Sequence, residues 1–295
     1  MALCRDEMLR RRRANQKRRL ILEDTGEETV GVDLPDLAAV TGSIANQTPA
    51  QSFNQYIWGF ALSWDGMHVT IANEDHYVRS YPLSTAWDLS TVGALEGTSA
   101  IFTGGSNNAV RSIGWSDDGL KLMAGMYYSR WIREDNLTTA YDVTEVGGFE
   151  DAKSSTFVDN TMGVWFLPGG EYFSYVKGNS DDVAIYKCTT PWDVTDITLQ
   201  GAASTTPHSC LSAIFSSDGT RLWMNDYVNT RVVQYTLSTP FNANTISADA
   251  GATYDYTIPY GGKDTIQMHW YDGALYTQNY DVTLGDESIL RHEFV

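Results

Sequence analysis

The sequence contains no hydrophobic run that could cross a membrane, because no stretch approaches the roughly 18 to 20 apolar residues that a spanning helix requires. Its first residues also lack the apolar segment of a secretory signal and lead directly into four arginines, Arg10 to Arg13. Three cysteines without C-x-x-C spacing indicate neither a disulfide framework nor a zinc site. We therefore expect no membrane partner, no exported form by that route, and either reduced thiols or one bridge between Cys188 and Cys210.

Residue patterns associated with catalysis are missing as well. The five histidines lack the i, i+4 spacing and the His-Glu-x-x-His arrangement of metal sites. The sequence also has no Gly-x-Ser-x-Gly motif, phosphate loop or dinucleotide fingerprint. We predict a protein that is not an enzyme and holds neither a metal nor a cofactor.

The composition that is present favours β-sheet. Hydrophobic residues make up 42% of 295 residues, which is enough for a core, so global disorder is excluded. Charged residues make up only 19%, and the segments between turn signals are rich in Thr, Ser, Val and Tyr. These residue types suit pleated sheet better than helix, which excludes an all-helical protein.

Charge is divided unevenly along the chain. Residues 1–19 hold eight basic and two acidic residues, a charge of +6, whereas the remaining residues hold 12 basic and 35 acidic ones, a charge of −23. Such asymmetry is typical of an interaction tail attached to a folded domain. Because an acidic body repels nucleic acid, contact with DNA or RNA is expected for the arm alone.

A repeat of about 50 residues organises the rest of the chain. An apolar strand that ends in a glycine turn occurs five times, with closing glycines 53, 51, 49 and 54 residues apart. Asp-Gly after an alternating apolar run is a strong hairpin signal, because glycine accepts the positive φ of a tight turn. The five turns close at Gly66, Gly119, Gly170, Gly219 and Gly273.

A second block follows each of the first four turns at nearly constant distance. The first copy reads Ser84-Thr-Ala-Trp-Asp-Leu-Ser-Thr91, and the fourth reads Ser238-Thr-Pro-Phe-Asn-Ala-Asn244. About 50 residues for four short antiparallel strands is the spacing of a propeller blade. The sequence therefore predicts an all-β fold, a five-bladed β-propeller over residues 31–295, preceded by an arginine-rich arm over residues 1–30.

The two ends of the propeller sequence predict how the ring closes. The fifth unit stops at residues 289–295, which match the third strand of the other units, so its outer strand is missing. Residues 31–40 resemble residues 86–95. We expect the N-terminal segment to supply the missing strand and to close the ring, which removes open sheet edges.

The repeat resembles a known one. The tandem Phe-Ser-x-Asp-Gly turn followed by Tyr-x-Leu-Ser-Thr-Pro-Trp-Asp-Leu-Ser-Thr is similar to the propeller repeat of proteins encoded by tailed bacteriophages, many of them virion components. The match runs from about Gly31 to Val295 and is most literal at residues 214–219, 235–240 and 83–91. It departs in the third unit, where Pro168-Gly-Gly170 replaces the Asp-Gly turn, and in the last unit, which lacks a Trp-Asp block. The resemblance implies a virion structural protein that is made in the host cytoplasm and sits in the virion, on the tail, on the baseplate or as capsid decoration.

Residues that recur at one place in every unit are predicted to have structural roles. The recurring acids are expected to cap turns and backbone amides, and the recurring aromatic residues to wedge between neighbouring blades rather than stack on sugars. The acids are Asp65, Asp118, Asp218 and Asp272 in the turns and Asp88, Asp142 and Asp193 in the blocks, where the fourth block has the amide Asn242 instead. The aromatic residues are Trp87, Tyr141, Trp192 and Phe241 in the blocks, and Trp115, Phe166, Phe215 and Trp270 on the apolar strands, which are expected in the core.

The segment that departs most from the repeat is residues 126–135 in the second unit. It combines aromatic residues with two arginines, types that are enriched in binding hot spots. We predict a protein or glycan contact there, formed by Tyr127, Tyr128, Arg130 and Trp131; a locally repacked strand is the alternative. The seven arginines outside the arm otherwise look scattered over four units, and a sialidase-like carboxylate clamp would need them clustered.

The basic arm is the second predicted partner site. Its cations are Arg10, Arg11, Arg12, Arg13, Lys17, Arg18 and Arg19. The arm could form a short helix, lie on nucleic acid, or thread into an acidic groove of another protein. We favour docking on another virion protein.

These observations favour binding over turnover. We expect a virion structural protein whose propeller is anchored to the particle by the basic arm. A glycan-binding or host-receptor adhesin that uses exposed Trp and Tyr is the alternative from another class, and a propeller glycosidase is a distant third.

Overall fold

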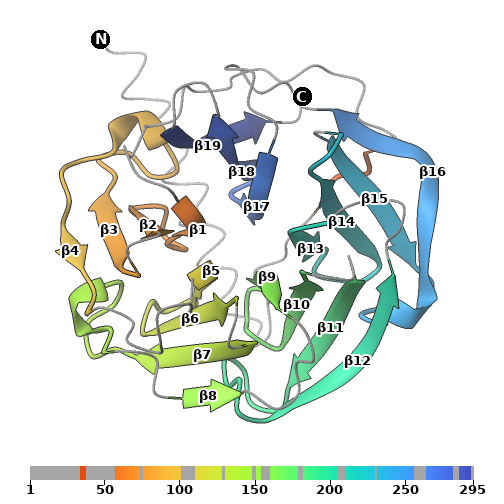
Figure 1. Ribbon diagram of the computed structural model, residues 1–295, viewed down its shortest axis with the longest axis horizontal. Coiled ribbons are helices and arrows are strands. Elements are labelled where there is room, and N and C mark those ends of the chain that lie inside the picture. Colours follow the sequence, from red (N-terminus) through yellow and green to blue (C-terminus); the bar gives the residue numbers. More distant parts are fainter. Residues whose placement is uncertain are drawn as a thin grey trace, which may run out of the picture.

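The computed structural model contains five antiparallel β-sheets arranged as blades around a central axis, so the predicted five-bladed β-propeller is confirmed (Figure 1). The structure describes residues 34–37, 57–73, 76–100, 110–127, 130–147, 151–153, 160–178, 182–204, 210–229, 231–255, 264–281 and 286–293. Within each blade the strands follow one another from the centre of the disc towards its rim.

The strands have the following bounds. Blade 1 holds β1 (Ile57–Leu62), β2 (His68–Asn73), β3 (Val78–Pro82) and β4 (Gly97–Thr98). Blade 2 holds β5 (Val110–Trp115), β6 (Lys121–Met126), β7 (Trp131–Asn136) and β8 (Asp151–Lys153). Blade 3 holds β9 (Thr161–Phe166), β10 (Tyr172–Lys177), β11 (Asp182–Cys188) and β12 (Ile197–Ser204). Blade 4 holds β13 (Ala213–Phe215), β14 (Arg221–Asp226), β15 (Arg231–Leu237) and β16 (Ile246–Asp255). Blade 5 holds β17 (Asp264–Tyr271), β18 (Ala274–Asp281) and β19 (Asp286–Glu293).

Three short 3-10 helices follow third strands: η1 (Leu89–Thr91), η2 (Val143–Glu145) and η3 (Ala243–Thr245). Because all five sheets repeat one strand order around the ring, the first residues of the inner strands share one face of the disc, here called the entry face. The turns between the first and second strands share the opposite face, here called the turn face. The two faces carry different chemistry.

Local hydrogen bonds explain why the turns form where the sequence predicts them. The Asp65 carboxylate accepts from the Met67 amide at 2.9 Å and from the Ser63 hydroxyl at 2.6 Å. This holds Gly66 at a φ of 73°, a conformation that glycine tolerates best. The same contacts recur around Asp118 and Asp218, which confirms the predicted capping role in three blades. In the fifth turn, Asp272 itself adopts a φ of 46°.

The recurring aromatic residue folds back onto the turn of its own blade. The Trp87 amide donates to the Gly66 carbonyl at 2.9 Å, and a Cβ added to Gly66 would meet the indole at 2.5 Å. Equivalent pairs in the other blades are Tyr141 with Gly119, Trp192 with Gly170 and Phe241 with Gly219. All four aromatic residues have φ between 58° and 65°, which the glycine contact stabilises.

The same rings lie between blades, as predicted. Phe241 stacks on Tyr172 of blade 3 with ring centroids 3.9 Å apart, and Trp87 stacks on Tyr271 of blade 5 at 5.4 Å. After each ring, a side chain caps the next turn of backbone, as when Asp88 accepts from the Ser90 amide at 3.0 Å. Asp142, Asp193 and Asn242 do the same in blades 2, 3 and 4, so the capping prediction is confirmed.

The inner strands supply the core. The four aromatic residues predicted there, Trp115, Phe166, Phe215 and Trp270, are each at most 5% exposed. Cys188 and Cys210 are buried thiols in separate hydrophobic clusters and are not bridged to each other. His292 is fully buried, and its Nε2 lies 2.8 Å from the Thr277 hydroxyl.

The described part of the N-terminal segment, residues 34–37, docks on blade 4. Leu34 and Leu37 are 1% and 4% exposed and belong to the same hydrophobic cluster as the blade-4 strands. The Leu34 carbonyl accepts from Arg221 at 3.0 Å, and the Leu37 amide donates to Gln234 at 3.0 Å. These four residues form no strand. The rest of residues 31–45, where we predict the missing outer strand of blade 5, lies outside the described residues.

The position of residues 34–37 on blade 4 corresponds to that of a block in another blade. On blade 2, Lys121 and Glu134 hold the block of blade 3 by bonding the Trp192 carbonyl at 3.2 Å and the Val194 amide at 3.2 Å. Arg221 and Gln234 occupy the same positions on blade 4. Arg221 is the first residue of the second strand, and Gln234 lies on the third strand, paired with the third residue of the second strand. Residues 34–37 therefore stand on blade 4 where the block of blade 5 belongs, which joins the two ends of the ring.

Candidate functional site

An arginine–aromatic cluster gathers on the entry face of blades 1 and 2. It comprises Trp58, Arg111, Tyr127, Trp131 and Arg133, all partly exposed. Trp58 stands near the start of β1 and Arg111 near the start of β5, so neighbouring inner strands bring them together. Tyr127 follows β6, and Trp131 begins β7. The cluster thus spans a blade boundary.

The arginines lie over the aromatic rings. The guanidinium carbon of Arg111 is 4.6 Å from the ring centroid of Trp58 and 4.8 Å from that of Tyr127, so it bridges the two blades. The guanidinium carbon of Arg133 is 4.0 Å from the Trp131 ring. Each contact is a cation–π interaction worth about 0.5 to 2 kcal/mol, more where water is excluded. Together they hold flat, rigid side chains in a defined arrangement at the surface.

Partial burial strengthens these contacts. Burial lowers the pKa of the Arg133 guanidinium from its ordinary value, while the neighbouring Asp135 carboxylate raises it. The group remains charged at any physiological pH because guanidinium titrates far above neutrality. A charged group that has given up part of its water shell gains more from a ring face than a fully hydrated one.

The structure places three of the four residues predicted in this region. Tyr127 and Trp131 lie in the cluster, and Arg130 is exposed beside them with a φ of 61°. Tyr128 lies outside the described residues. The arm residues Arg10 to Arg13, Lys17, Arg18 and Arg19 also lie outside them.

Sequence reasoning missed Trp58, Arg111 and Arg133. The seven arginines do fall in four blades, as predicted, but three of them, Arg111, Arg130 and Arg133, belong to blade 2. A usable signal was present, because the start of the inner strand and the start of the third strand lie on one face in any propeller blade. Aligning the repeat by strand ends rather than by turns would have put these arginines together.

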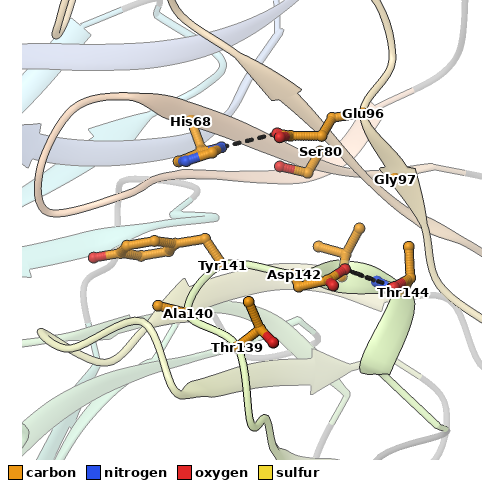
Figure 2. A pocket seen from close by; sticks show the side chains of 10 residues that line it. His68, Ser80, Glu96, Gly97, Thr139, Ala140, Tyr141, Asp142 and Thr144 are labelled. Atoms are coloured by element: carbon orange, nitrogen blue, oxygen red, sulfur yellow. Dashed lines mark hydrogen bonds and ion pairs between the residues drawn. The ribbon is translucent and has the colours of Figure 1, made fainter.

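A pocket of about 270 Å³ lies between blades 1 and 2, near the turn face (Figure 2). Its blade-1 wall consists of His68, Ser80, Glu96 and Gly97, and its blade-2 wall is residues 139–144. His68 Nδ1 lies 3.1 Å from Glu96 Oε2, and the imidazole stacks on the Tyr141 ring with centroids 5.5 Å apart. Burial raises the pKa of the Tyr141 hydroxyl to about 12, so it stays protonated.

The blade-1 wall of the pocket contains a buried hydroxyl. Ser80 is 2% exposed, and its Oγ makes no hydrogen bond within the described residues. On the opposite wall, Asp142 uses Oδ1 to accept from the amide and hydroxyl of Thr144 at 2.9 and 2.6 Å. Figure 2 shows these groups facing one another across the gap between the two blades. The pocket thus presents two carboxylates and a buried hydroxyl.

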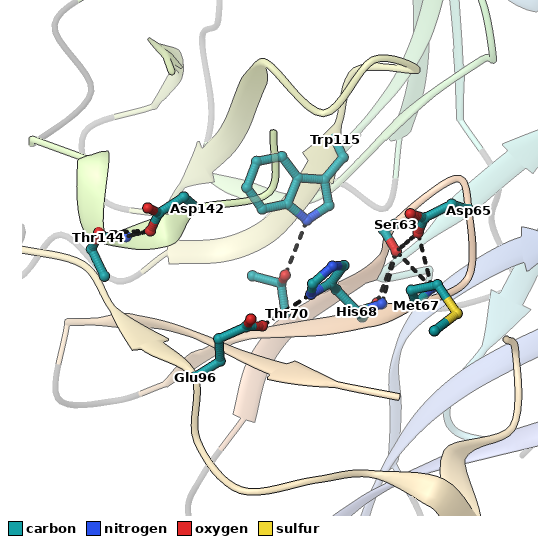
Figure 3. A network of polar contacts seen from close by, with 9 residues as sticks. All are labelled: Ser63, Asp65, Met67, His68, Thr70, Glu96, Trp115, Asp142 and Thr144. Atoms are coloured by element: carbon teal, nitrogen blue, oxygen red, sulfur yellow. Dashed lines mark hydrogen bonds and ion pairs between the residues drawn. The ribbon is translucent and has the colours of Figure 1, made fainter. Parts of the chain in front are cut away.

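A network of hydrogen bonds surrounds the pocket (Figure 3). Trp115 Nε1 donates to the Thr70 hydroxyl at 3.0 Å, which ties β5 to β2 behind the pocket. The Ser63 hydroxyl accepts from the His68 amide at 2.9 Å and so fixes the start of β2. These two bonds connect blade 2 to blade 1 and fix the strand that carries His68.

Three further findings concern metal ligands, membrane-spanning helices and the recurring acids among the described residues. No three His, Cys, Asp or Glu side chains among them gather as a metal site requires. No helix within the described ranges is long and apolar enough to cross a membrane. The recurring acids of the first four blades that the structure describes accept hydrogen bonds from nearby backbone or hydroxyl groups.

Comparison with known proteins finds likeness in shape. No protein-family model matches the sequence, and no curated protein matches it. Among solved structures, the β-propeller domain of Cps50 (Swd1) from Myceliophteria thermophila matches with 12% identity and a TM-score of 0.46 over 80% of this chain. A chain of the Mitotic Checkpoint Complex matches with 13% identity and a TM-score of 0.45, also over 80%. This chain spans 66% and 62% of those two chains, and nothing about partners or activity follows from propellers this different in sequence.

Proposed function

We propose that this protein is a bacteriophage virion structural protein in which the propeller is a binding module and the basic arm anchors it to the particle. The arginine–aromatic cluster is the observation that supports a binding role. It breaks the repeat, it lies on one face, and it combines the residue types that dominate the energy of protein interfaces. The sequence repeat, through its resemblance to phage propellers, supports the virion setting.

The charge distribution supports a division of labour between arm and disc. Outside residues 1–19 the chain carries a charge of −23, so a patch that holds Arg111, Arg130 and Arg133 stands out against an acidic surface. Such a patch attracts an acidic partner surface and orients the disc as it approaches. The arm, with a charge of +6, reaches a second partner without involving the disc. The protein would then link two components of the particle.

An adhesin is the second candidate, because three aromatic rings gather on one face. Sugar recognition by stacking requires an open ring face, however. Arg111 already covers one face of both Trp58 and Tyr127, and Arg133 covers one face of Trp131. We therefore place protein docking ahead of glycan binding.

Co-purification with phage particles tests the proposal. Full-length protein and a truncation that lacks residues 1–22 are produced in infected cells, and particles are analysed by mass spectrometry and negative-stain microscopy. We expect the full-length protein in particles and loss of the truncated form. Failure of the full-length protein to join particles would refute the virion role.

The cluster is tested separately with a matched loop of another blade. The loop from Met126 to Trp131 and the loop from Asp226 to Arg231 connect the second and third strands at the same register. We expect Arg130→Ala with Trp131→Ala to abolish binding to the disc's partner, while the exposed Val228→Ser in the sister loop leaves it unchanged. A glycan array on the same variants distinguishes the adhesin: specific glycan binding that requires Trp131 would favour it.

A further inference from the structure

The pocket between blades 1 and 2 exists because two side chains of blade 1 are short. Longer side chains fill the equivalent spaces next to other blades. In each of blades 1 to 4, two positions face the block that follows: the first residue of the second strand, and the third-strand residue that pairs with the third residue of the second strand. In blade 1 these are His68 and Ser80. The other pairs are Lys121 and Glu134, Tyr172 and Ile185, and Arg221 and Gln234.

Two of these sister interfaces hold a cation. Lys121 donates to the Trp192 carbonyl at 3.2 Å and to Glu134 at 3.1 Å. Arg221 donates to the Leu34 carbonyl at 3.0 Å, beside Gln234. In both, a long cationic side chain fills the space between one blade and the next block, and an oxygen-bearing side chain lies next to it. The fold thus has a standard place for a guanidinium or ammonium group.

Blade 3 solves the same packing problem without charge. Tyr172 stacks on Phe241 with centroids 3.9 Å apart, and Ile185 is fully buried beside them. Blade 1 adopts neither solution. His68 stacks on Tyr141, and its Nδ1 contacts Glu96. The Ser80 hydroxyl is buried without a hydrogen bond in the described part of the chain. The space that results is the pocket of about 270 Å³.

We propose that this pocket binds an alkylguanidinium or alkylammonium group, which takes the place of the cationic side chain that blade 1 lacks. The Glu96 and Asp142 carboxylates supply the opposite charge, and the Ser80 hydroxyl accepts a hydrogen bond from the ligand. A buried polar atom without a partner is unfavourable, and a hydrogen bond from the ligand removes that penalty. The Tyr141 ring forms an apolar side for the alkyl stem.

The pocket and the arginine–aromatic cluster are independent sites. The cluster lies on the entry face and presents positive charge, whereas the pocket lies near the turn face and presents negative charge. The inference therefore stands whether or not the protein is part of a virion.

An NMR titration with N-acetyl-arginine amide tests the inference on the full chain. We expect saturable shifts of the Gly97 and Thr144 amides. N-acetyl-citrulline amide has the same shape without the charge and should bind at least tenfold more weakly. Equal affinity for the two compounds, or no shift with either, would overturn the proposal.

Variants separate the pocket from the general attraction of an acidic protein for cations. Glu96→Gln should weaken binding of N-acetyl-arginine amide at least tenfold, and Ser80→Ala should weaken it several-fold. Glu171→Gln removes one negative charge from a surface pair with Lys187 outside the pocket and should leave affinity unchanged. Equal weakening by Glu96→Gln and Glu171→Gln would show that no site exists.

A double variant provides the sharpest test. His68→Lys with Ser80→Glu recreates the pair that blade 2 carries at the equivalent positions. We expect it to melt at a higher temperature than the natural protein and to lose binding of N-acetyl-arginine amide. Binding retained at full affinity in a folded double variant would refute the site.

The source of the cation is distinguished by a further comparison. If the ligand is a protein side chain, an acetylated and amidated Gly-Gly-Arg-Gly-Gly peptide should bind at least tenfold more tightly than methylguanidinium. If the ligand is a free small cation, the two should bind equally. Both results support the chemistry of the pocket and assign its occupant.

Discussion

The side-chain amide of Gln234 on β15 donates to the Asp36 carboxylate at 2.9 Å, although 198 positions separate the two residues. Gln234 Oε1 also accepts from the Leu37 amide at 3.0 Å and from the Trp223 indole at 3.1 Å. One buried side chain therefore holds both the blade-4 core and the segment that joins the ends of the ring.

We predict that Gln234→Ala destabilises the protein by about 2 to 6 kcal/mol, because it leaves two buried N–H groups without a partner at about 1 to 3 kcal/mol each. Asp36→Asn keeps an acceptor oxygen and should cost less than about 1 kcal/mol. Urea unfolding measures both. A Gln234→Ala protein as stable as the natural one would show that residues 34–37 do not fasten the ring, and deletion of residues 31–45 should then leave a cooperative transition instead of abolishing it.

Alanine substitutions at two turn glycines distinguish the cost of backbone strain from the cost of a steric clash. Gly119 has a φ of 71° and lies against Tyr141, whose ring a new Cβ would meet at 2.6 Å, whereas Gly273 has a φ of 76° and nothing within 4 Å. Gly273→Ala should cost about 1 to 2 kcal/mol from the positive φ alone. Gly119→Ala should cost about 1 to 3 kcal/mol more, because the ring must move. Thermal unfolding measures both, and equal losses would mean that the Tyr141 contact contributes nothing.

The indole of Trp115 connects blade 2 to blade 1 through the hydroxyl of Thr70, both residues being at most 2% exposed. Thr70→Val preserves shape but removes the acceptor, and we expect a loss of about 1 to 3 kcal/mol. Thr70→Ser keeps the hydroxyl and loses only a methyl group, so it should retain the hydrogen bond. The indole N–H resonance reports the bond directly: it should shift in Thr70→Val and stay near its natural position in Thr70→Ser.

The buried His292 makes stability depend on pH. Burial lowers its pKa to about 4 from an ordinary value of 6.5. Between these values the unfolded chain takes up a proton that the folded chain refuses, so the free energy of unfolding falls as pH drops through this window, by about 1.4 kcal/mol per pH unit at most. Above pH 6.5 this contribution is fully present.

His292→Gln removes the titrating group and keeps a hydrogen-bonding partner for Thr277. We expect the variant to lose less stability than the natural protein between pH 6.5 and pH 4. His269 is buried too, with its pKa lowered to about 3, so part of the acid sensitivity should persist. Parallel pH curves for the two proteins would contradict the assignment to His292.

The number of blades and the roles of the recurring residues could be predicted from sequence because each depends on contacts within one repeat. Asp65 caps the turn two residues away, and Trp87 folds back on Gly66 of its own blade. Hydrogen bonds and ring contacts of this kind form over a short span of chain. A repeated residue therefore reports a repeated local structure.

The candidate sites could be predicted only in part because both lie between repeats. Tyr127 and Trp131 stood out by composition, but Trp58 joins them only when β1 and β5 pack side by side and bring it to Arg111. The pocket was not visible in the sequence at all, since it arises where His68 and Ser80 fail to fill a space that Lys121 and Glu134 fill one blade later.

The sequence alone thus determined the architecture: five glycine turns at a spacing of about 50 residues, four of them with an aspartate before the glycine, specify five similar sheets, and those sheets bury their apolar faces by packing in a ring. Tertiary structure decided the chemistry of the surface. A cavity or a cation–π pair at a blade boundary depends on the side chains that meet there from two blades. Their combined volume and their contacts become fixed only when the blades pack against each other.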